Sequence, residues 1–505
     1  MQLPIRFPQR RKGPMISDFS VPLLATGLLW YSSPYDLTLA EVMAAFLLSW
    51  LPWASYRSWH RGERKDIPFF ALLAGMYWLV YAVPLFWGSH ETGSVAGRRA
   101  LSEEGITAAL YLAVTGVVAL WAGIGLAARF HWLPAIGVDV SDAPRRRRYL
   151  QITLILATLV KVFVPITAWG EGGRQIIVNI ENMVPTVSFA IFLRYYLRRR
   201  ASELEKLLIL GYVFIGLIVG ISSGWLGSLV GLGITCMVLY TYERRKFPLR
   251  AALIAIPIIL FFQPAKSEFR ERYWSGKVTG SYSERIVFWG ERSWNMWDNA
   301  IADKTGEQGK RLGAATLSRL SLLEQTANIM ELTPGRVPYQ YGRLYSYMAI
   351  TFIPRFLWPE KPSANEANQW YQVSYGLTLP GQLSHVSIAV GSLAESYISF
   401  GWFGPLLIMF PLGVLLGSIQ RIFLRADSGL LLSSLGAVMV PQLLAVESQL
   451  VIYVAGLAQQ TFVVLLVLVP TLKSRKEKAA PAVALAPRAN RDVRIRATAA
   501  SKNRC

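Results

Sequence analysis

Cysteine, histidine and charged residues are all scarce in this chain. Its 505 residues include two cysteines, four histidines and 16% charged residues, whereas an average soluble protein is about one quarter charged. Cys236 falls in an apolar run and Cys505 is the last residue, so the sequence predicts no disulfide framework, no metal cluster and no redox chemistry. The low charge also argues against a soluble enzyme.

Apolar and basic residues are abundant instead. The chain contains 53% hydrophobic residues, 17 tryptophans and a formal net charge of +21. Such a charge in a soluble domain indicates nucleic-acid binding, but the cytoplasmic loops of membrane proteins are also rich in Lys and Arg. The distribution of the basic residues decides between these two interpretations.

Twelve apolar stretches are long enough to cross about 30 Å of hydrocarbon. They lie near residues 17–34, 37–56, 67–87, 106–128, 149–169, 176–197, 207–222, 225–242, 249–264, 402–420, 428–446 and 449–472. With the N-terminus inside, 34 of the 52 Lys and Arg residues fall in inside segments, 17 fall outside, and Lys161 lies within a span. The sequence therefore predicts an all-α polytopic membrane protein with about 12 transmembrane helices and both termini in the cytoplasm, and it rejects nucleic acid as a partner.

The spans divide the chain into four regions. These are an N-terminal transmembrane bundle of about nine helices (1–264), an external catalytic segment with interfacial or re-entrant helices (265–400), about three C-terminal transmembrane helices (401–472) and a basic disordered cytoplasmic tail (473–505). A loop as long as the external segment is usually functional. Its 14 Lys and Arg residues nearly balance 12 Asp and Glu residues, so individual cations rather than a general basic surface must recognise an anionic ligand.

Five cations in the external segment are candidates for that role. Lys266 and Arg270 lie one helical turn apart at the predicted membrane boundary, where they favour either a lipid-linked phosphate or an interfacial anchor. Arg319 belongs to an Arg-x-Ser string, and Arg355 and Lys361 flank prolines that fix the backbone. Arg binds a diphosphate in bidentate fashion and Lys supplies a compact charge.

Other parts of the external segment have an apolar or titratable character. Residues 286–297 place Trp at helical spacing, which predicts an amphipathic helix on the outer leaflet. The apolar run 345–358 is interrupted by Pro354, which favours a re-entrant or interfacial helix over a pass. Glu395 is predicted at the outer mouth of the bundle, either as a structural partner for an Arg or as a titrating functional group, and His385 precedes it.

The order of these motifs resembles the Wzy-type O-antigen and exopolysaccharide repeat-unit polymerases, the oligosaccharide repeat unit polymerase family. The motifs are Gln-Pro-x-Lys-x-x-x-Arg (263–270), Arg-x-Ser (319–321), Tyr-Gly (341–342), Ile-Pro-Arg-x-x-Trp-Pro-x-Lys-Pro (353–362) and Gly-x-x-x-Glu-x-Tyr-x-x-Phe-Gly (391–401). They and their flanking helices cover about a third of the chain. Ser399 stands where many relatives have Asn before Phe-Gly.

The resemblance implies a C-type inverting glycosyltransferase that needs neither metal nor cofactor. Such an enzyme transfers a growing glycan from undecaprenyl diphosphate to the sugar end of a lipid-linked repeat unit, at the outer face of the bacterial inner membrane. A chain-length regulator and a flippase are the implied protein partners. The residues implied for the donor diphosphate are Lys266, Arg270, Arg319, Arg355 and Lys361, and those implied for activating the acceptor are Glu395 and His385.

Two alternatives remain open at this stage. An O-antigen ligase uses the same donor but places the glycan on the lipid A core. A polysaccharide flippase or other transporter would also have many passes, but it should carry charged residues inside its bundle and broken helices at mid-membrane. The polar motifs are concentrated in one external loop, which favours surface chemistry over transport.

Overall fold

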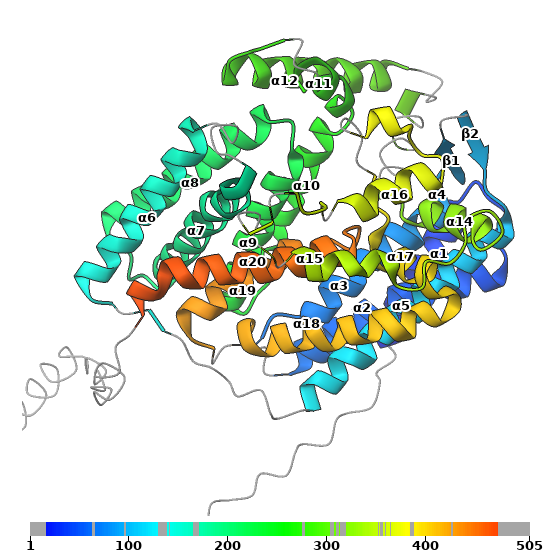
Figure 1. Ribbon diagram of the computed structural model, residues 1–505, viewed down its shortest axis with the longest axis horizontal. Helices are drawn as coiled ribbons and strands as arrows, with labels where there is room; N and C mark the ends of the chain where they lie inside the picture. The colour runs from blue at the N-terminus through cyan, green and yellow to red at the C-terminus, as the bar shows by residue number, and fades with distance from the viewer. Residues whose placement is uncertain are drawn as a thin grey trace, which may run out of the picture.

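In the computed structural model the chain is helical, with one short β-hairpin (Figure 1). The structure describes residues 17–472 except 63–65, 95–96, 130–138, 141, 165–170, 275–277, 304–307, 310–312, 314–319, 352, 354–356, 359, 364, 384–387 and 426–427. The hairpin joins β1 (Glu91–Ser94) to antiparallel β2 (Gly97–Ala100), with Glu91 opposite Ala100. The predicted tail 473–505 lies outside the described residues.

The N-terminal half is a succession of helices up to the start of the predicted external segment. They are α1 (Ser17–Tyr31), α2 (Leu39–Arg61), α3 (Phe69–Tyr77), the π-helical η1 (Trp78–Ala82), α4 (Val83–Trp87), α5 (Glu103–Arg129), α6 (Pro144–Phe163), α7 (Glu171–Leu197), α8 (Glu203–Ser222), α9 (Leu226–Arg244) and α10 (Leu249–Phe262).

Shorter helices fill the predicted external segment, and longer ones return after it. They are α11 (Lys266–Tyr273), α12 (Tyr282–Ala302), α14 (Leu323–Leu332), η3 (Arg343–Ser346), α15 (Tyr347–Thr351), α16 (Glu366–Ser374), η4 (Pro380–Gln382), α17 (Gly391–Phe400), η5 (Gly401–Phe403), η6 (Pro405–Met409), α18 (Phe410–Phe423), α19 (Gly429–Leu443), α20 (Leu450–Leu468) and η7 (Val469–Thr471).

Local sequence explains where several of these helices begin. Thr38, Ser202 and Ser281 precede α2, α8 and α12, and each is followed three residues later by a glutamate. Each pair forms a capping box, in which the hydroxyl accepts from the glutamate N–H and the carboxylate accepts from the cap N–H. Two otherwise unpaired donors at each helix start are thereby satisfied.

The predicted count of twelve transmembrane helices is wrong. Each of the twelve apolar stretches contains a helix, but within the described residues six are long and apolar enough to cross a membrane: Phe69–Trp87, Glu103–Arg129, Glu203–Ser222, Leu226–Arg244, Pro405–Phe423 and Leu450–Thr471. A seventh results if α10 and α11, which are bent by 56°, form one broken span. Six or seven such helices fit a multi-pass membrane protein.

Length and charge explain why four of the other predicted passes fail. α1 and α19 have 15 residues each, which is short of the roughly 20 residues that a span needs. α6 begins with four consecutive arginines and carries Lys161 in its last turn. α2 likewise contains Glu41, Arg57 and Arg61. Charges within a helix raise the cost of placing it in hydrocarbon.

The tightest helix pairing in the core joins α5 to α18. Small residues at the crossing allow the two backbones to approach closely. A methyl group on Gly413 of α18 would lie 2.5 Å from the carbonyl oxygen of Leu120 in α5, so only glycine fits there. This pair contributes to the main core, on which α17 and α14 also pack.

α11 and α12 form a separate cap at one edge of the molecule, across the top of the view in Figure 1. A small second core of Leu226, Ala265, Phe269 and Trp289 lies beneath them. The indole of Trp289 donates to the carbonyl of Phe262 at 3.0 Å, at the end of α10. The predicted helix over 286–297 is confirmed, and Trp289 is buried in protein while Trp294 is 66% exposed.

Candidate functional site

Four of the seven predicted site residues fall in the part of the chain that the structure describes. These are Lys266 and Arg270 on α11, Lys361 in the loop before α16, and Glu395 on α17. The other three, Arg319, Arg355 and His385, lie outside the described residues. Figure 1 shows α11 well apart from α17, so the two predicted groups on these helices are separated.

Arg270 is held by two aromatic rings. Its guanidinium carbon lies 4.1 Å from the ring centroid of Trp274 and 5.3 Å from that of Trp225, and the two indoles stack at 6.0 Å. Lys266 opens α11 directly after the bend from α10. The aromatic contacts are those of an interfacial anchor, and the predicted phosphate contact stays a prediction.

Lys361 is engaged with backbone carbonyl groups. Its ammonium donates to the carbonyl of Ile353 at 2.7 Å and to that of Thr351 at 3.4 Å. The side chain of Gln459, on α20, donates to the same Thr351 oxygen at 3.4 Å. Lys361 therefore ties its loop to the end of α15, and Gln459 ties the same end of α15 to α20.

Two of the sequence motifs are brought together by the fold. The N–H of Gln340 donates to the carbonyl of Ile398 at 2.9 Å, and the N–H of Tyr341 donates to that of Ser399 at 3.0 Å. The ring of Tyr339 meets that of Tyr397 edge to face, with centroids 6.2 Å apart. The Tyr-Gly string is thus bonded along the end of the helix that carries the Glu-x-Tyr string.

Gly342 makes this junction possible. Its φ is +84°, a left-handed conformation that side chains rarely adopt. A methyl group there would also lie 3.2 Å from Cζ of Phe400. The turn at Gly342 directs the chain into η3, which begins at Arg343.

Glu395 lies at the centre of α17 and is fully buried. Its Oε2 accepts a hydrogen bond from the N–H of Leu450, the first residue of α20, at 2.9 Å. Its Oε1 has no hydrogen-bond partner among the described residues. Burial raises the pKa of Glu395 to about 7, against the opposing effect of the Leu450 N–H. Glu395 thus exchanges its proton near neutral pH, as acid–base groups do.

A polar cluster surrounds this carboxyl group. Burial, reinforced by the charge of Glu395, raises the pKa of the Tyr345 hydroxyl well above its ordinary value, so Tyr345 stays protonated. Gln449, one residue before Leu450, is buried, and both polar atoms of its side chain lack partners within the described ranges. Buried polar atoms without partners are costly and concentrate at functional sites.

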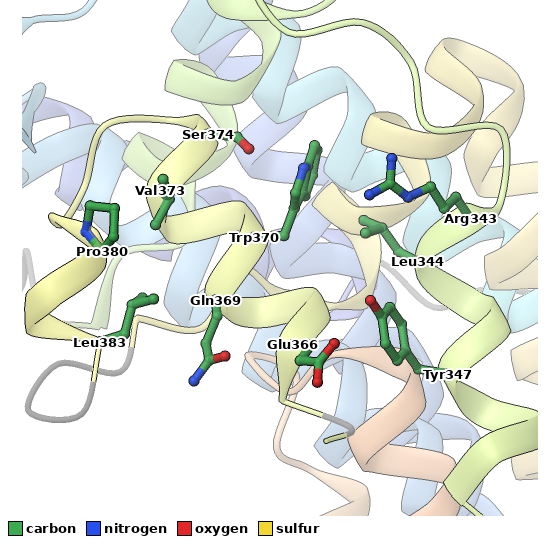
Figure 2. Close-up of a pocket in the computed structure, with 10 residues that line it drawn as sticks. All are labelled: Arg343, Leu344, Tyr347, Glu366, Gln369, Trp370, Val373, Ser374, Pro380 and Leu383. Atoms are coloured by element: carbon green, nitrogen blue, oxygen red, sulfur yellow. The ribbon is translucent and has the colours of Figure 1, made fainter. Parts of the chain in front are cut away.

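An open pocket of about 350 Å³ lies between the η3–α15 segment and α16 (Figure 2). Its lining consists of Arg343, Leu344, Tyr347, Glu366, Gln369, Trp370, Val373, Ser374, Pro380 and Leu383. Figure 2 shows the guanidinium of Arg343 pointing toward the indole of Trp370, with the Glu366 carboxylate and the Tyr347 hydroxyl close together beside them. The pocket therefore combines apolar walls with converging polar groups, as ligand sites do.

α16 forms one wall of the pocket, and its opposite face is anchored to α14. The hydroxyl of Tyr371 donates to Oε1 of Gln325 on α14 at 3.1 Å. The hydroxyl of Tyr375 lies 2.5 Å from that of Thr333, just after α14. Both tyrosines are buried, so the pocket is anchored to α14 from behind.

The pocket and the buried carboxyl share one segment of chain. Leu344 and Tyr347 line the pocket. Tyr345 lies between them in sequence, and burial and the charge of Glu395 together raise its pKa. The sequence assigned no role to Arg343, Glu366, Gln369 or Trp370, although the last three share a visible pattern. The available signal was their i, i+3, i+4 spacing, continued at i+7 by Val373, which places them on one face of a helix.

A metal centre has no candidate ligand set here. Among the residues that the structure describes, no three His, Cys, Asp or Glu side chains come together as a metal site would require.

Comparison with protein families matches residues 104–439, more than half of the chain, to a domain of unknown function, DUF8712. No curated protein and no solved structure matches the chain. The matched region runs from α5 into α19 and includes Glu395, Tyr345 and the pocket, whereas Gln449 and Leu450 follow it in the chain. This chain is thus a member of the DUF8712 family.

Proposed function

We propose that this protein is a polysaccharide polymerase of the bacterial inner membrane. It would transfer a growing glycan from undecaprenyl diphosphate to the sugar end of a lipid-linked oligosaccharide repeat unit at the outer face. The observation that carries the proposal is the meeting of two motifs, Tyr-Gly at 341–342 and Glu-x-Tyr at 395–397, the second of which carries a buried carboxyl group, while Arg343, Leu344 and Tyr347, just after the first, line an open pocket.

The donor end of the reaction requires cations at the membrane surface. No nucleotide sugar is present outside the cell, so the leaving group must arrive on a lipid, and its diphosphate gains negative charge as the glycosidic bond breaks. Lys266 and Arg270 follow the bend at the end of α10, where such a headgroup would meet the protein. Together with Arg319, Arg355 and Lys361, they are the groups that we assign to stabilising this charge.

The acceptor end requires a group that takes the proton of the attacking hydroxyl. We assign this role to Glu395, with His385 as the alternative, because burial places the pKa of Glu395 at about 7. Its complete burial means that the proton must reach Glu395 through a neighbouring group. We propose that Tyr345 passes this proton on, because burial and the charge of Glu395 together raise the pKa of the Tyr345 hydroxyl.

The direct test uses the full-length protein in lipid nanodiscs. It is supplied with undecaprenyl-diphosphate-linked repeat units, and product length is measured on gels. The wild type should form long chains, and Glu395→Gln should lower the rate by about 100-fold or more. Glu360→Gln is the matched control, because Glu360 is an exposed glutamate of the same external segment.

Deletion in cells separates the two enzyme classes. Loss of a polymerase leaves single repeats on the lipid A core, whereas loss of a ligase leaves long polymer that is not ligated. Accumulation of unligated polymer, or full polymerisation by Glu395→Gln at normal protein levels, would contradict the proposal.

A further inference from the structure

We propose that the pocket between the η3–α15 segment and α16 binds a neutral sugar ring of the acceptor repeat unit. The chemical class of this ligand follows from the lining of the pocket, and its identity as the acceptor rests on the proposed function.

The lining offers both surfaces that a pyranose needs. A sugar ring has an apolar C–H face and a rim of hydroxyl groups, so it binds best between a flat aromatic side chain and hydrogen-bonding groups. Trp370 supplies the aromatic surface, with Leu344 beside it, while Gln369 and Ser374 supply donors and acceptors. A cavity of about 350 Å³ falls in the range of small-molecule sites.

The charges of the pocket favour a neutral ligand. One cation, Arg343, and one anion, Glu366, line the same cavity, so a diphosphate attracted by Arg343 would be repelled by the carboxylate. Arg343 and Glu366 suit hydroxyl groups better, because one donates and the other accepts. Burial, followed by the nearby Glu366 carboxylate, raises the pKa of Tyr347, so its hydroxyl remains a donor.

The aromatic wall is held in a fixed orientation. The ring of Trp370 meets that of Tyr375 at 87°, with centroids 6.4 Å apart, and Tyr375 is itself bonded to Thr333. A preformed wall lowers the entropic cost of binding. Tyr345 lies between two pocket residues in sequence, and burial and the charge of Glu395 together raise its pKa, so one segment of chain links the pocket to the proposed proton acceptor.

The experiment measures binding and turnover separately on the full-length protein in nanodiscs. Binding is followed by saturation-transfer NMR with the repeat-unit oligosaccharide released from its lipid by mild acid. Turnover is measured with intact lipid-linked donor and acceptor. The variants are Trp370→Ala, Trp370→Phe and Gln369→Ala, and Trp294→Ala on α12 is the control, because Trp294 is a tryptophan that lies outside the pocket.

The expected result is an acceptor KM at least tenfold higher in Trp370→Ala, with the donor KM unchanged and most of the loss recovered in Trp370→Phe. The oligosaccharide NMR signal should fall in Trp370→Ala and Gln369→Ala but not in Trp294→Ala. If the wild type is active and all three pocket variants have the same acceptor KM as the wild type, the inference is overturned and the proposed function still stands.

Failure of the proposed function would give a different result from failure of the inference. If the wild type forms no polymer, the polymerase proposal fails, while the NMR arm still decides whether the pocket binds a saccharide. Absence of oligosaccharide binding to the wild type overturns the inference on its own. Displacement of the bound oligosaccharide by equimolar pyrophosphate also overturns it, because the pocket would then belong to the donor diphosphate.

Discussion

Replacing Glu395 with glutamine should remove a pH dependence from the stability of the protein. Burial raises the pKa of this carboxyl in the folded state from 4.5 to about 7. Below pH 4.5 the group is protonated in both states and costs nothing. Between pH 4.5 and 7 the unfolded chain releases this proton while the folded protein retains it, so folding stability falls as the pH rises.

The size of the effect follows from the pKa difference. A pKa difference of roughly 2.5, at about 1.4 kcal/mol for each pKa unit, gives a loss of roughly 3.5 kcal/mol that is complete above pH 7. Glutamine is nearly isosteric, keeps an acceptor for the Leu450 N–H and does not titrate. The Glu395→Gln variant should therefore lack this part of the decline.

The assay is thermal unfolding of the detergent-solubilised protein, followed by tryptophan fluorescence at pH 5, 6, 7 and 8. The Tm of the wild type should drop over this range, and the Tm difference between Glu395→Gln and wild type should increase in favour of the variant. Glu360→Gln, which changes an exposed glutamate, should follow the wild type. The same slope in Glu395→Gln and in the wild type would refute the reasoning that burial dominates at this site.

Three further perturbations test individual contacts. Gly342→Ala should destabilise the protein by about 1–2 kcal/mol, because the backbone φ there is +84° and the Phe400 ring is close. Gly290→Ala, on a helix with open space around it, should stabilise the protein by about 0.5–1 kcal/mol. Equal Tm shifts in the two variants would contradict this. Arg270→Ala should cost about 1–2 kcal/mol by removing two cation–π contacts, measured as a lower Tm, and an unchanged Tm would show that the stacking contributes nothing. Lys361→Met should raise amide exchange in residues 347–351 by about 3- to 10-fold, because it removes the bonds to Thr351 and Ile353; exchange at the wild-type rate would rule out this tie.

Much of the local structure is predictable from the sequence. All twelve apolar stretches contain helices, because apolar runs of that length satisfy their backbone hydrogen bonds internally. The capping glutamates at 41, 205 and 284 lie three residues after a Ser or Thr, which is a visible signature of a helix start. The number of spans was overestimated, because hydropathy alone does not reveal that α1 and α19 end after 15 residues.

The candidate site is predictable only in part. Glu395 was singled out because a carboxylate near a membrane span is unusual, but its burial and its bond to Leu450 depend on how α17 meets α20. The pocket was missed because its two walls, Arg343 to Tyr347 and Glu366 to Ser374, are separated by a loop whose path the sequence does not specify. The roles assigned to Arg319, Arg355 and His385 stay predictions, because these residues lie outside the described part of the chain.

The helical, apolar character of the chain, the excess of basic residues in its short loops and the motifs that carry its resemblance follow from residue type and local spacing, and they can be read without a structure. Three features depend instead on how distant segments pack: Tyr341 lies along the end of α17, Glu395 is buried, and Arg343 points toward Trp370. Burial and juxtaposition depend on contacts between distant segments, and the pKa of a carboxyl group responds to that surrounding rather than to its neighbours in sequence.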